Sequence, residues 1–122
     1  MANVVIIRVE SVDAGYDGVA ILERINFEIR RGEVFGILGG SGCGKSTLMK
    51  HMIGLNPPVA GHIYIGEDDI VTADDEKLED IQRRFGVMYQ SGALFGSMTL
   101  LENVRLPLEV YTELPDAAID LI

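Results

Sequence analysis

One stretch of nine residues constrains the fold of this chain more than any other. It reads Gly39-Gly40-Ser41-Gly42-Cys43-Gly44-Lys45-Ser46-Thr47 and matches the spacing Gly, four residues, Gly, Lys and Ser or Thr. The apolar run from Val34 to Leu38 precedes it and is typical of a buried strand. Apolar residues at helical spacing follow it, at Leu48, Met49, Met52 and Ile53, with Gly54 placed where a helix would end. The stretch is therefore predicted to be a loop between a strand and a helix.

The residue types in this loop suit the binding of phosphate groups. Glycines allow successive backbone N–H groups to converge on an anion, and the N-terminus of the following helix favours the same negative charge. Lys45 is expected to reach the β- and γ-phosphates of a nucleotide and to assist catalysis there. The Ser46 hydroxyl is expected to bind Mg²⁺. The alternative is a glycine-rich turn with an incidental Lys-Ser pair, but the combined pattern and context favour a nucleotide site formed by residues 39 to 47.

Length and charge narrow the class of protein. The chain has 122 residues, of which 48% are hydrophobic, which is enough for one domain but short for most nucleotide hydrolases. No apolar run approaches the roughly 20 residues needed to cross a bilayer. The single cysteine, Cys43, cannot form an internal disulfide, so we expect a cytoplasmic chain. The net charge is −9 and no basic stripe is present, which argues against a nucleic-acid partner.

The remaining sequence predicts a β-rich first third and helices later. Strands are expected at residues 4–12, 25–30, 62–65 and 85–89, with a turn at 15–18 that contains Tyr16. Helices are expected after a cap at Thr72, from Thr99 to Pro107 through a capping box, and after Pro115. Gln90 ends the last predicted strand.

These features resemble the first half of an ATP-binding subunit of an ABC transporter, over nearly all 122 positions. Tyr16 resembles the aromatic that stacks on adenine, residues 39–47 the P-loop, residues 61–70 the strand and turn after the P-loop helix, and Gln90 the Q-loop glutamine. The resemblance implies an α/β fold of the P-loop nucleotide hydrolase class, with an N-terminal antiparallel β subdomain. Residues 1–122 would then form the N-terminal part of a single ATP-binding domain, up to the Q-loop and the start of the helical subdomain.

The segment from Tyr89 to Phe95, followed by Met98-Thr99 and Glu102-Asn103-Val104, is most similar to the ATPase of Mla-type systems. That family is implied to move phospholipid between bacterial membranes. The resemblance implies ATP and Mg²⁺ as cofactors, a transmembrane permease and a second ATPase subunit as partners, and a location at the inner face of the plasma membrane. Contact with the membrane would occur only through the permease.

Two residues outside the loop have roles implied by this resemblance. Tyr16 would stack on the nucleobase, although an ordinary turn tyrosine is the alternative. Gln90 would bind Mg²⁺ or orient an attacking water as a catalytic residue, because a neutral oxygen at the end of a strand can do either. A solvent-exposed loop glutamine is the alternative reading.

Several sequences that the family uses for hydrolysis do not occur in this chain. The Walker B acid, the LSGGQ signature and the later histidine are missing, so we expect a truncated chain that is inactive alone. A non-catalytic nucleotide-binding or interaction fragment is the main alternative function. A GTPase is less favoured because no Asn/Thr-Lys-x-Asp sequence occurs.

Four other features are expected to be structural. The acids after Ile65 form a solvated cluster rather than a metal site. His51 lies off the predicted apolar face of the P-loop helix, and His62 begins a strand without a second ligand at metal spacing. Cys43 is expected to be a small residue that the loop tolerates, although its position near a helix N-terminus could raise its reactivity.

Overall fold

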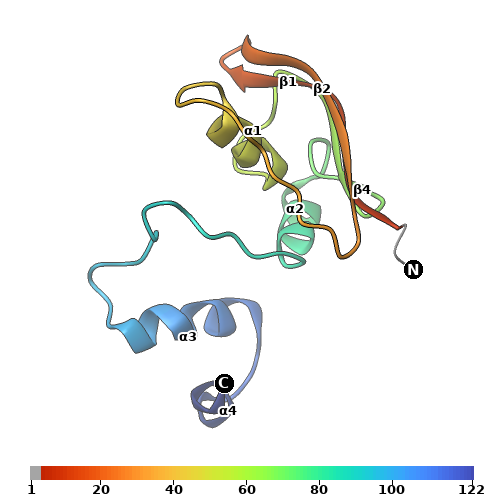
Figure 1. Ribbon diagram of the computed structural model, residues 1–122. Coiled ribbons are helices and arrows are strands. Elements are labelled where there is room, and N and C mark those ends of the chain that lie inside the picture. Colours follow the sequence, from red (N-terminus) through yellow and green to blue (C-terminus); the bar gives the residue numbers. More distant parts are fainter. Residues whose placement is uncertain (1–3) are drawn as a thin grey trace. The chain divides into compact units, whose positions relative to one another are not determined.

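The computed structural model describes residues 4–122, and they divide into two units (Figure 1). Unit 1 ends at Phe85 and contains a β-sheet with the helices α1 and α2. Unit 2 covers Gly86–Ile122 and contains the helices α3 and α4.

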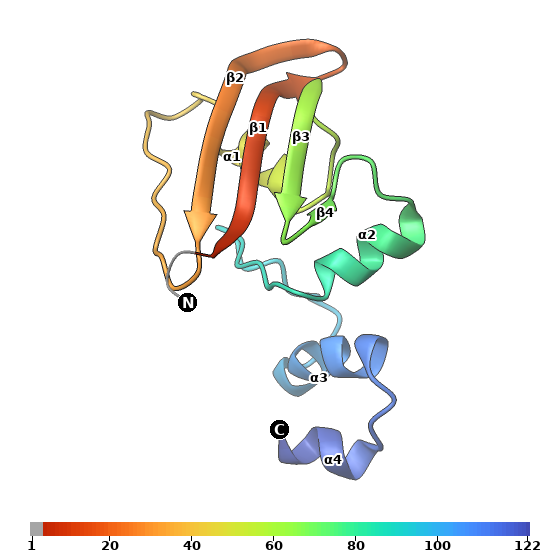
Figure 2. The ribbon, with the colours of Figure 1, turned by 90° about the vertical axis from the view of Figure 1, so that its right-hand side faces the viewer.

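The sheet of unit 1 has four antiparallel strands in the order β2-β1-β3-β4 (Figure 2). Strands β1 (Val5–Tyr16) and β2 (Val19–Arg30) form a long hairpin, and β3 (Ala60–Ile65) pairs with the other edge of β1. The short strand β4 (Asp68–Asp69) completes the sheet. The predicted antiparallel β-rich first third is therefore present.

The β1–β2 hairpin is longer than the sequence pattern suggested. Tyr16 pairs with Val19, so Tyr16 ends β1 and only Asp17 and Gly18 form the turn. Their φ angles are 50° and 76°, and a two-residue hairpin turn of type I′ requires positive φ at both positions. Asp and Gly tolerate this conformation better than other residues, which explains why the turn forms there.

One face of the sheet is covered by α1 (Lys45–Met52), which lies behind β1 and β3 in Figure 2. The buried core is formed by apolar side chains from the sheet, both helices and the loop between them: Val9, Val12, Ala14, Leu48, Met52, Ile63, Ile70 and Ile81. Alternation along β3, and along β1 on either side of the irregularity between Val9 and Val12, sends side chains to this face. The core thus fixes α1, and with it the start of α1, against the sheet.

Helix α2 (Asp75–Gln82) starts later than predicted. Asp74, not Thr72, is its N-cap, because the Asp74 carboxylate accepts a hydrogen bond from the Lys77 N–H at 2.8 Å. Asp68 in turn accepts ion pairs from Arg84 at 2.7 Å and from Lys77 at 3.3 Å. These contacts hold the pKa of Asp68 below its ordinary value, chiefly through Arg84. The acidic cluster is therefore used in part to attach α2 to the β3–β4 turn.

Two predicted strands are not strands in this structure. Residues 34–38 and 85–89 are extended but unpaired, and Val34, Leu38 and Met88 are 99%, 94% and 96% exposed. A buried parallel strand requires neighbours on both edges and cover on both faces. Within residues 4–122 all strand pairing is antiparallel and none of it involves these two segments. The expectation of two buried strands was thus wrong for this chain.

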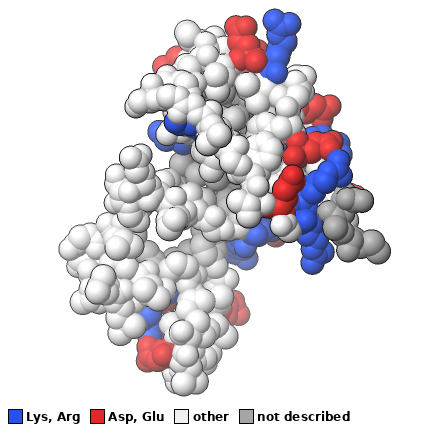
Figure 3. Space-filling view, viewed as in Figure 1, with Lys and Arg blue, Asp and Glu red and all other residues white. Residues whose placement is uncertain are grey.

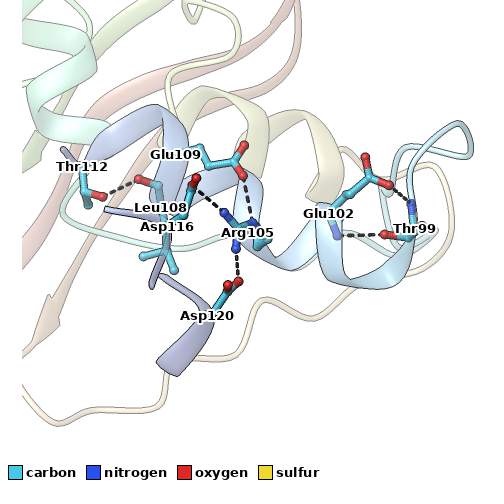
Figure 4. Close-up of polar contacts among 8 residues, drawn as sticks. All are labelled: Thr99, Glu102, Arg105, Leu108, Glu109, Thr112, Asp116 and Asp120. Atoms are coloured by element: carbon cyan, nitrogen blue, oxygen red, sulfur yellow. Dashed lines mark hydrogen bonds and ion pairs between the residues drawn. The ribbon is translucent and has the colours of Figure 1, made fainter. Parts of the chain in front are cut away.

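In unit 2, α3 runs from Leu100 to Tyr111 and α4 from Asp116 to Leu121. The predicted capping box is present: the Glu102 N–H donates to the Thr99 hydroxyl, and the Thr99 N–H donates to the Glu102 carboxylate, each at 3.1 Å (Figure 4). The helix continues through Pro107 rather than ending there. Proline lacks the N–H donor and its ring crowds the carbonyl four residues earlier, yet helical turns are present on both sides of Pro107.

No helix among residues 4–122 is both long and apolar enough to cross a membrane.

Candidate functional site

The glycine-rich stretch forms a loop that leads directly into α1. A turn closes within it, where the Cys43 N–H donates to the Gly40 carbonyl at 3.3 Å. Gly42 and Gly44 have φ angles of 80° and 100°, and Gly44 is the N-cap residue of α1. The first helical bond runs from the Leu48 N–H to the Gly44 carbonyl at 2.9 Å. The predicted loop and helix are both present, whereas the strand before them is extended chain.

Two glycines in this loop occupy positions that other residues would strain. A Cβ on Gly39 would lie 2.5 Å from the Cys43 Sγ. Gly44 has left-handed backbone geometry, and a Cβ there would approach the Leu22 side chain to 3.0 Å. The close approach of Leu22 also shows that the end of the β1–β2 hairpin packs against the start of α1. The loop thus keeps its shape only without side chains at these places.

The N-terminus of α1 lacks the groups that usually neutralise it. No side chain caps the helix, and no acidic residue lies in its first turn. The free N–H groups of a first helical turn carry partial positive charge and attract anions. Among the residues described, this end of α1 is therefore chemically suited to a phosphate group.

Lys45 curls back over the loop. Its Nζ donates a hydrogen bond to the Gly39 carbonyl oxygen. The ammonium group therefore lies at the first residue of the loop, although the Lys45 backbone is at the start of α1. The next residue, Ser46, is exposed, whereas Thr47 is buried. The loop therefore presents a cation and a free hydroxyl side by side, and these groups fit a phosphate and a hard metal ion respectively.

Tyr16 lies beside the same helix. A hydrogen bond from the Thr47 side chain lowers the pKa of the Tyr16 phenol, with a smaller contribution from Lys50. Tyr16 is 40% exposed as a residue, so part of it remains accessible to a partner. Tyr16 therefore lies beside Thr47 and Lys50 of α1, and the loop of residues 39–47 leads into the same helix.

Gln90 belongs to unit 2. It lies in a turn closed by a hydrogen bond from the Gly92 N–H to the Tyr89 carbonyl at 3.3 Å, and its side chain is exposed. Because Gln90 and the loop belong to different units, the role of Gln90 at the nucleotide remains a prediction.

The two histidines have different environments. His51 is 1% exposed, so the expectation that it lies off the buried face of α1 was wrong. Each of its ring nitrogens contacts the backbone: Nε2 lies 3.1 Å from the Gly15 nitrogen and Nδ1 lies 2.8 Å from the Asn56 carbonyl oxygen. His62 is exposed and lies 2.6 Å from an Asp69 oxygen.

No group of three or more His, Cys, Asp or Glu side chains that could bind a metal ion occurs within residues 4–122. The predicted magnesium ligands, Ser46 and Gln90, are a hydroxyl and an amide, so this observation does not bear on them.

The sequence pattern missed Leu22 and His51 as neighbours of the site. Thr47 was assigned to the loop for its phosphate chemistry, but its side chain contacts Tyr16. Only the three-dimensional approach of the hairpin to α1 identifies these contacts, because the residues are separated along the chain and form no motif.

The ABC transporter family model matches residues 22–121 of the chain. The chain is 39% identical to the probable ribonucleotide transport ATP-binding protein of Mycobacterium leprae, over 94% of its own length and 33% of that protein. It is also 39% identical to a spermidine/putrescine import ATP-binding protein of Fusobacterium nucleatum, over 85% of the chain and 26% of the relative. The chain thus spans about a third of the length of these curated relatives.

Solved structures of ATP-binding cassettes are also similar to this chain. A dimeric bacterial ABC transporter cassette has a TM-score of 0.84 and 31% identity, covering 93% of this chain and 52% of the other. A related structure of an ATP-binding cassette bound to ADP and phosphate has a TM-score of 0.82 and 30% identity, over the same shares of the two chains. A protein from Clostridium perfringens described as part of an ABC transporter complex has a TM-score of 0.78 and 29% identity, with coverage of 98% and 47%.

The predicted fold class is confirmed by these structures, and the family match confirms the resemblance to an ATP-binding subunit of an ABC transporter. From the loop geometry, the family match over residues 22–121 and the shared fold, we conclude that this chain belongs to the ATP-binding domain of the ABC transporter family.

Proposed function

We propose that this chain provides the nucleotide-binding part of an ABC transporter ATPase, which couples ATP binding and hydrolysis to transport. The observation that carries the proposal is the uncapped start of α1, where Gly44 is left-handed and Lys45 lies across the loop. A helix N-terminus preceded by such a loop binds phosphate groups well.

The residues divide into groups with different tasks. Backbone N–H groups of residues 39 to 47 would bind the phosphates, and Lys45 would add a charge-assisted hydrogen bond to them. Ser46 and Gln90 would supply neutral oxygens to Mg²⁺, which neutralises phosphate charge when bound. Tyr16 would stack on the base, a contact worth roughly 1–3 kcal/mol. Gln90 would also orient the attacking water.

Hydrolysis and transport require more than these residues. We infer that a second ATPase subunit and a transmembrane permease complete the assembly, at the inner face of the plasma membrane and without direct membrane contact. The names of related structures, one a dimeric cassette and one part of a transporter complex, support this assembly. A non-catalytic nucleotide-binding role remains the alternative, and the two are separated by whether the assembled transporter that contains this chain hydrolyses ATP.

The nucleotide site is tested by the affinity of the 122-residue chain for Mg-ATP. Lys45→Ala removes the ammonium, so we expect affinity to fall at least about tenfold, because hydrogen bonds from charged groups contribute about 1.5–3 kcal/mol. Lys77→Ala is the matched control, because it removes the same charge from α2, where Lys77 pairs with Asp68. Isothermal titration calorimetry gives both affinities. Equal losses in the two variants, or no binding by the parent chain, would contradict the proposal.

Hydrolysis is measured in parallel. We expect the 122-residue chain to bind ATP without releasing phosphate, because no residue with the role of the water-activating acid was found in the sequence. A phosphate-release assay at saturating Mg-ATP checks this, with Lys45→Ala as the blank. Turnover that depends on Lys45 would show that this chain is active alone.

The identity of the transported substrate is the most specific part of the proposal. We propose phospholipid, on the resemblance of residues 89–104 to Mla-type ATPases. The relatives bear other substrates in their names, among them ribonucleotide, spermidine and putrescine, and methionine. Transfer of a fluorescent phospholipid between vesicles by the assembled transporter, absent with Lys45→Ala, would support phospholipid. ATP-dependent uptake of one of the other solutes, without lipid transfer, would contradict it.

A further inference from the structure

A buried histidine links the phosphate-binding helix to the backbone beside Tyr16. His51 lies in the last turn of α1 and is 1% exposed. Its Nε2 lies 3.1 Å from the Gly15 nitrogen, and because a backbone nitrogen is a donor, Nε2 must be the acceptor. Nδ1 then carries the proton and donates it to the Asn56 carbonyl at 2.8 Å. The two contacts fix one neutral tautomer of the ring.

The Gly15 contact is adjacent to the aromatic residue of the site. Gly15 immediately precedes Tyr16 at the end of β1, so its N–H lies one residue before the Tyr16 N–H. A Cβ at Gly15 would lie 1.9 Å from the Val19 carbonyl oxygen, so the backbone there has little room to move. The Tyr16 and His51 rings lie 6.2 Å apart, centre to centre, at an interplanar angle of 52°.

Helix α1 therefore holds Tyr16 at two places. Thr47, in the first turn of α1, lowers the pKa of the Tyr16 phenol through a side-chain hydrogen bond. His51, one turn further on, accepts from the N–H of the Ala14–Gly15 peptide group, one residue before Tyr16. Gly44 is the N-cap of the same helix, so both residues relate the end of β1 to the phosphate-binding loop.

We propose that His51 is a positioning residue for base recognition: its hydrogen bond from the Gly15 N–H holds the end of β1, and with it Tyr16, in place for stacking on the base of a nucleoside triphosphate. This inference rests on the proposed nucleotide site. It assigns to the site a residue that contacts neither base nor phosphate. The competing interpretation is that His51 only stabilises unit 1, as a buried and fully hydrogen-bonded core residue does.

The two ring contacts can be separated by two amide substitutions. In His51→Gln the longer side chain can place its amide oxygen near Nε2 and accept from Gly15. In His51→Asn the shorter side chain can still donate to the Asn56 carbonyl but does not reach Gly15. Both variants keep a buried polar side chain of similar chemistry, so they form a matched pair.

Affinities are measured for Mg-ATP and for Mg-tripolyphosphate, which has the phosphates but no base. We expect His51→Asn to weaken Mg-ATP binding about tenfold and to leave tripolyphosphate binding unchanged, whereas His51→Gln binds both ligands like the parent chain. In a Tyr16→Leu background the His51→Asn effect on Mg-ATP should disappear, because the residue to be positioned is absent. Thermal unfolding of each variant is recorded alongside.

Three results would overturn the inference. One is an equal loss for both ligands in His51→Asn, and another is an effect that persists in Tyr16→Leu. The third is equal binding of Mg-ATP and Mg-tripolyphosphate by the parent chain, which would leave the phosphate site standing but remove base recognition. Failure of the parent chain to bind either ligand would refute the proposed function itself, and so is distinguishable from failure of the His51 inference.

Discussion

Unit 1 and unit 2 are stabilised by different forces. The contiguous apolar core belongs entirely to unit 1, where Val12 and Ile63 are completely buried. In unit 2, α3 has no buried residue, and apolar side chains such as Leu100 and Val104 are 79% and 71% exposed. On the face shown in Figure 3, most of the surface of unit 2 is uncharged. The candidate phosphate-binding loop therefore belongs to the better-packed unit.

Polar contacts take the place of a core in unit 2. The Arg105 guanidinium is mostly buried and pairs with Glu109 on its own helix and with Asp116 and Asp120 on α4 (Figure 4). Asn103 accepts from the Phe95 N–H at 2.8 Å and donates to the Thr99 carbonyl at 2.9 Å. Such contacts shape a short helical segment but contribute little net free energy at the surface. Unit 2 should therefore respond to salt and pH more than unit 1.

The largest expected effect tests the core of unit 1. Ile63→Ala removes a fully buried side chain from the centre of β3, and such substitutions reduce the free energy of unfolding by about 2–5 kcal/mol. Val104→Ala, on exposed α3, should change it by less than about 0.5 kcal/mol. Guanidinium unfolding followed by circular dichroism measures both. Equal effects would show that the two units do not differ in packing.

The next effect concerns the start of α3. Thr99→Ala removes the hydroxyl that accepts the Glu102 N–H, and loss of such a cap costs about 1 kcal/mol. We expect faster amide hydrogen exchange in residues 100–104, with no change in α1. Thr99→Ser keeps the hydroxyl and serves as the control. Unchanged exchange in Thr99→Ala would mean that the cap does not stabilise the helix.

A smaller effect is expected at the ion cluster of Arg105. Arg105→Gln removes three ion pairs, two of which join Arg105 to Asp116 and Asp120 on α4. The protection of the α4 amides from hydrogen exchange should therefore fall. The same protection in the parent chain should fall as salt rises, because salt screens these charges. Arg8→Gln, which removes one ion pair from the sheet of unit 1, should leave α4 unchanged. Protection in α4 that is independent of both salt and Arg105 would contradict the comparison.

The smallest effect is a pH dependence at Glu102. Its carboxylate accepts the Thr99 N–H, and this bond holds its pKa below the ordinary 4.5. The ionised carboxylate thus stabilises the folded helix above that pH, and the contribution is lost as pH falls through the lowered pKa. Glu102→Gln keeps a capping box but should remove this part of the pH dependence. An NMR titration of the α3 amides between pH 6 and 3 measures this pH dependence. Identical titration curves for the parent chain and Glu102→Gln would refute the prediction.

The sequence predicted unit 1 better than the detail of its site. Local patterns are sufficient for the turn at Asp17-Gly18, for the loop and for the start of α1 at Gly44-Lys45, because each depends on neighbouring residues. Residues 34–38 were misjudged because burial of an apolar strand depends on partners that a local pattern does not specify. His51 was misjudged for a related reason. Its partner Gly15 is 36 positions away, and a single polar residue gives no periodic signal.

The central claim is that the loop before α1 binds the phosphates of ATP with its backbone. Amide chemical-shift mapping by NMR on adding Mg-ATP tests it most directly, because it reports the backbone of each residue. We predict the largest shifts at Gly40 to Thr47, a further shift at Tyr16 and no change in α2. No shifts in the loop at saturating Mg-ATP, or shifts of equal size throughout unit 1, would contradict the account.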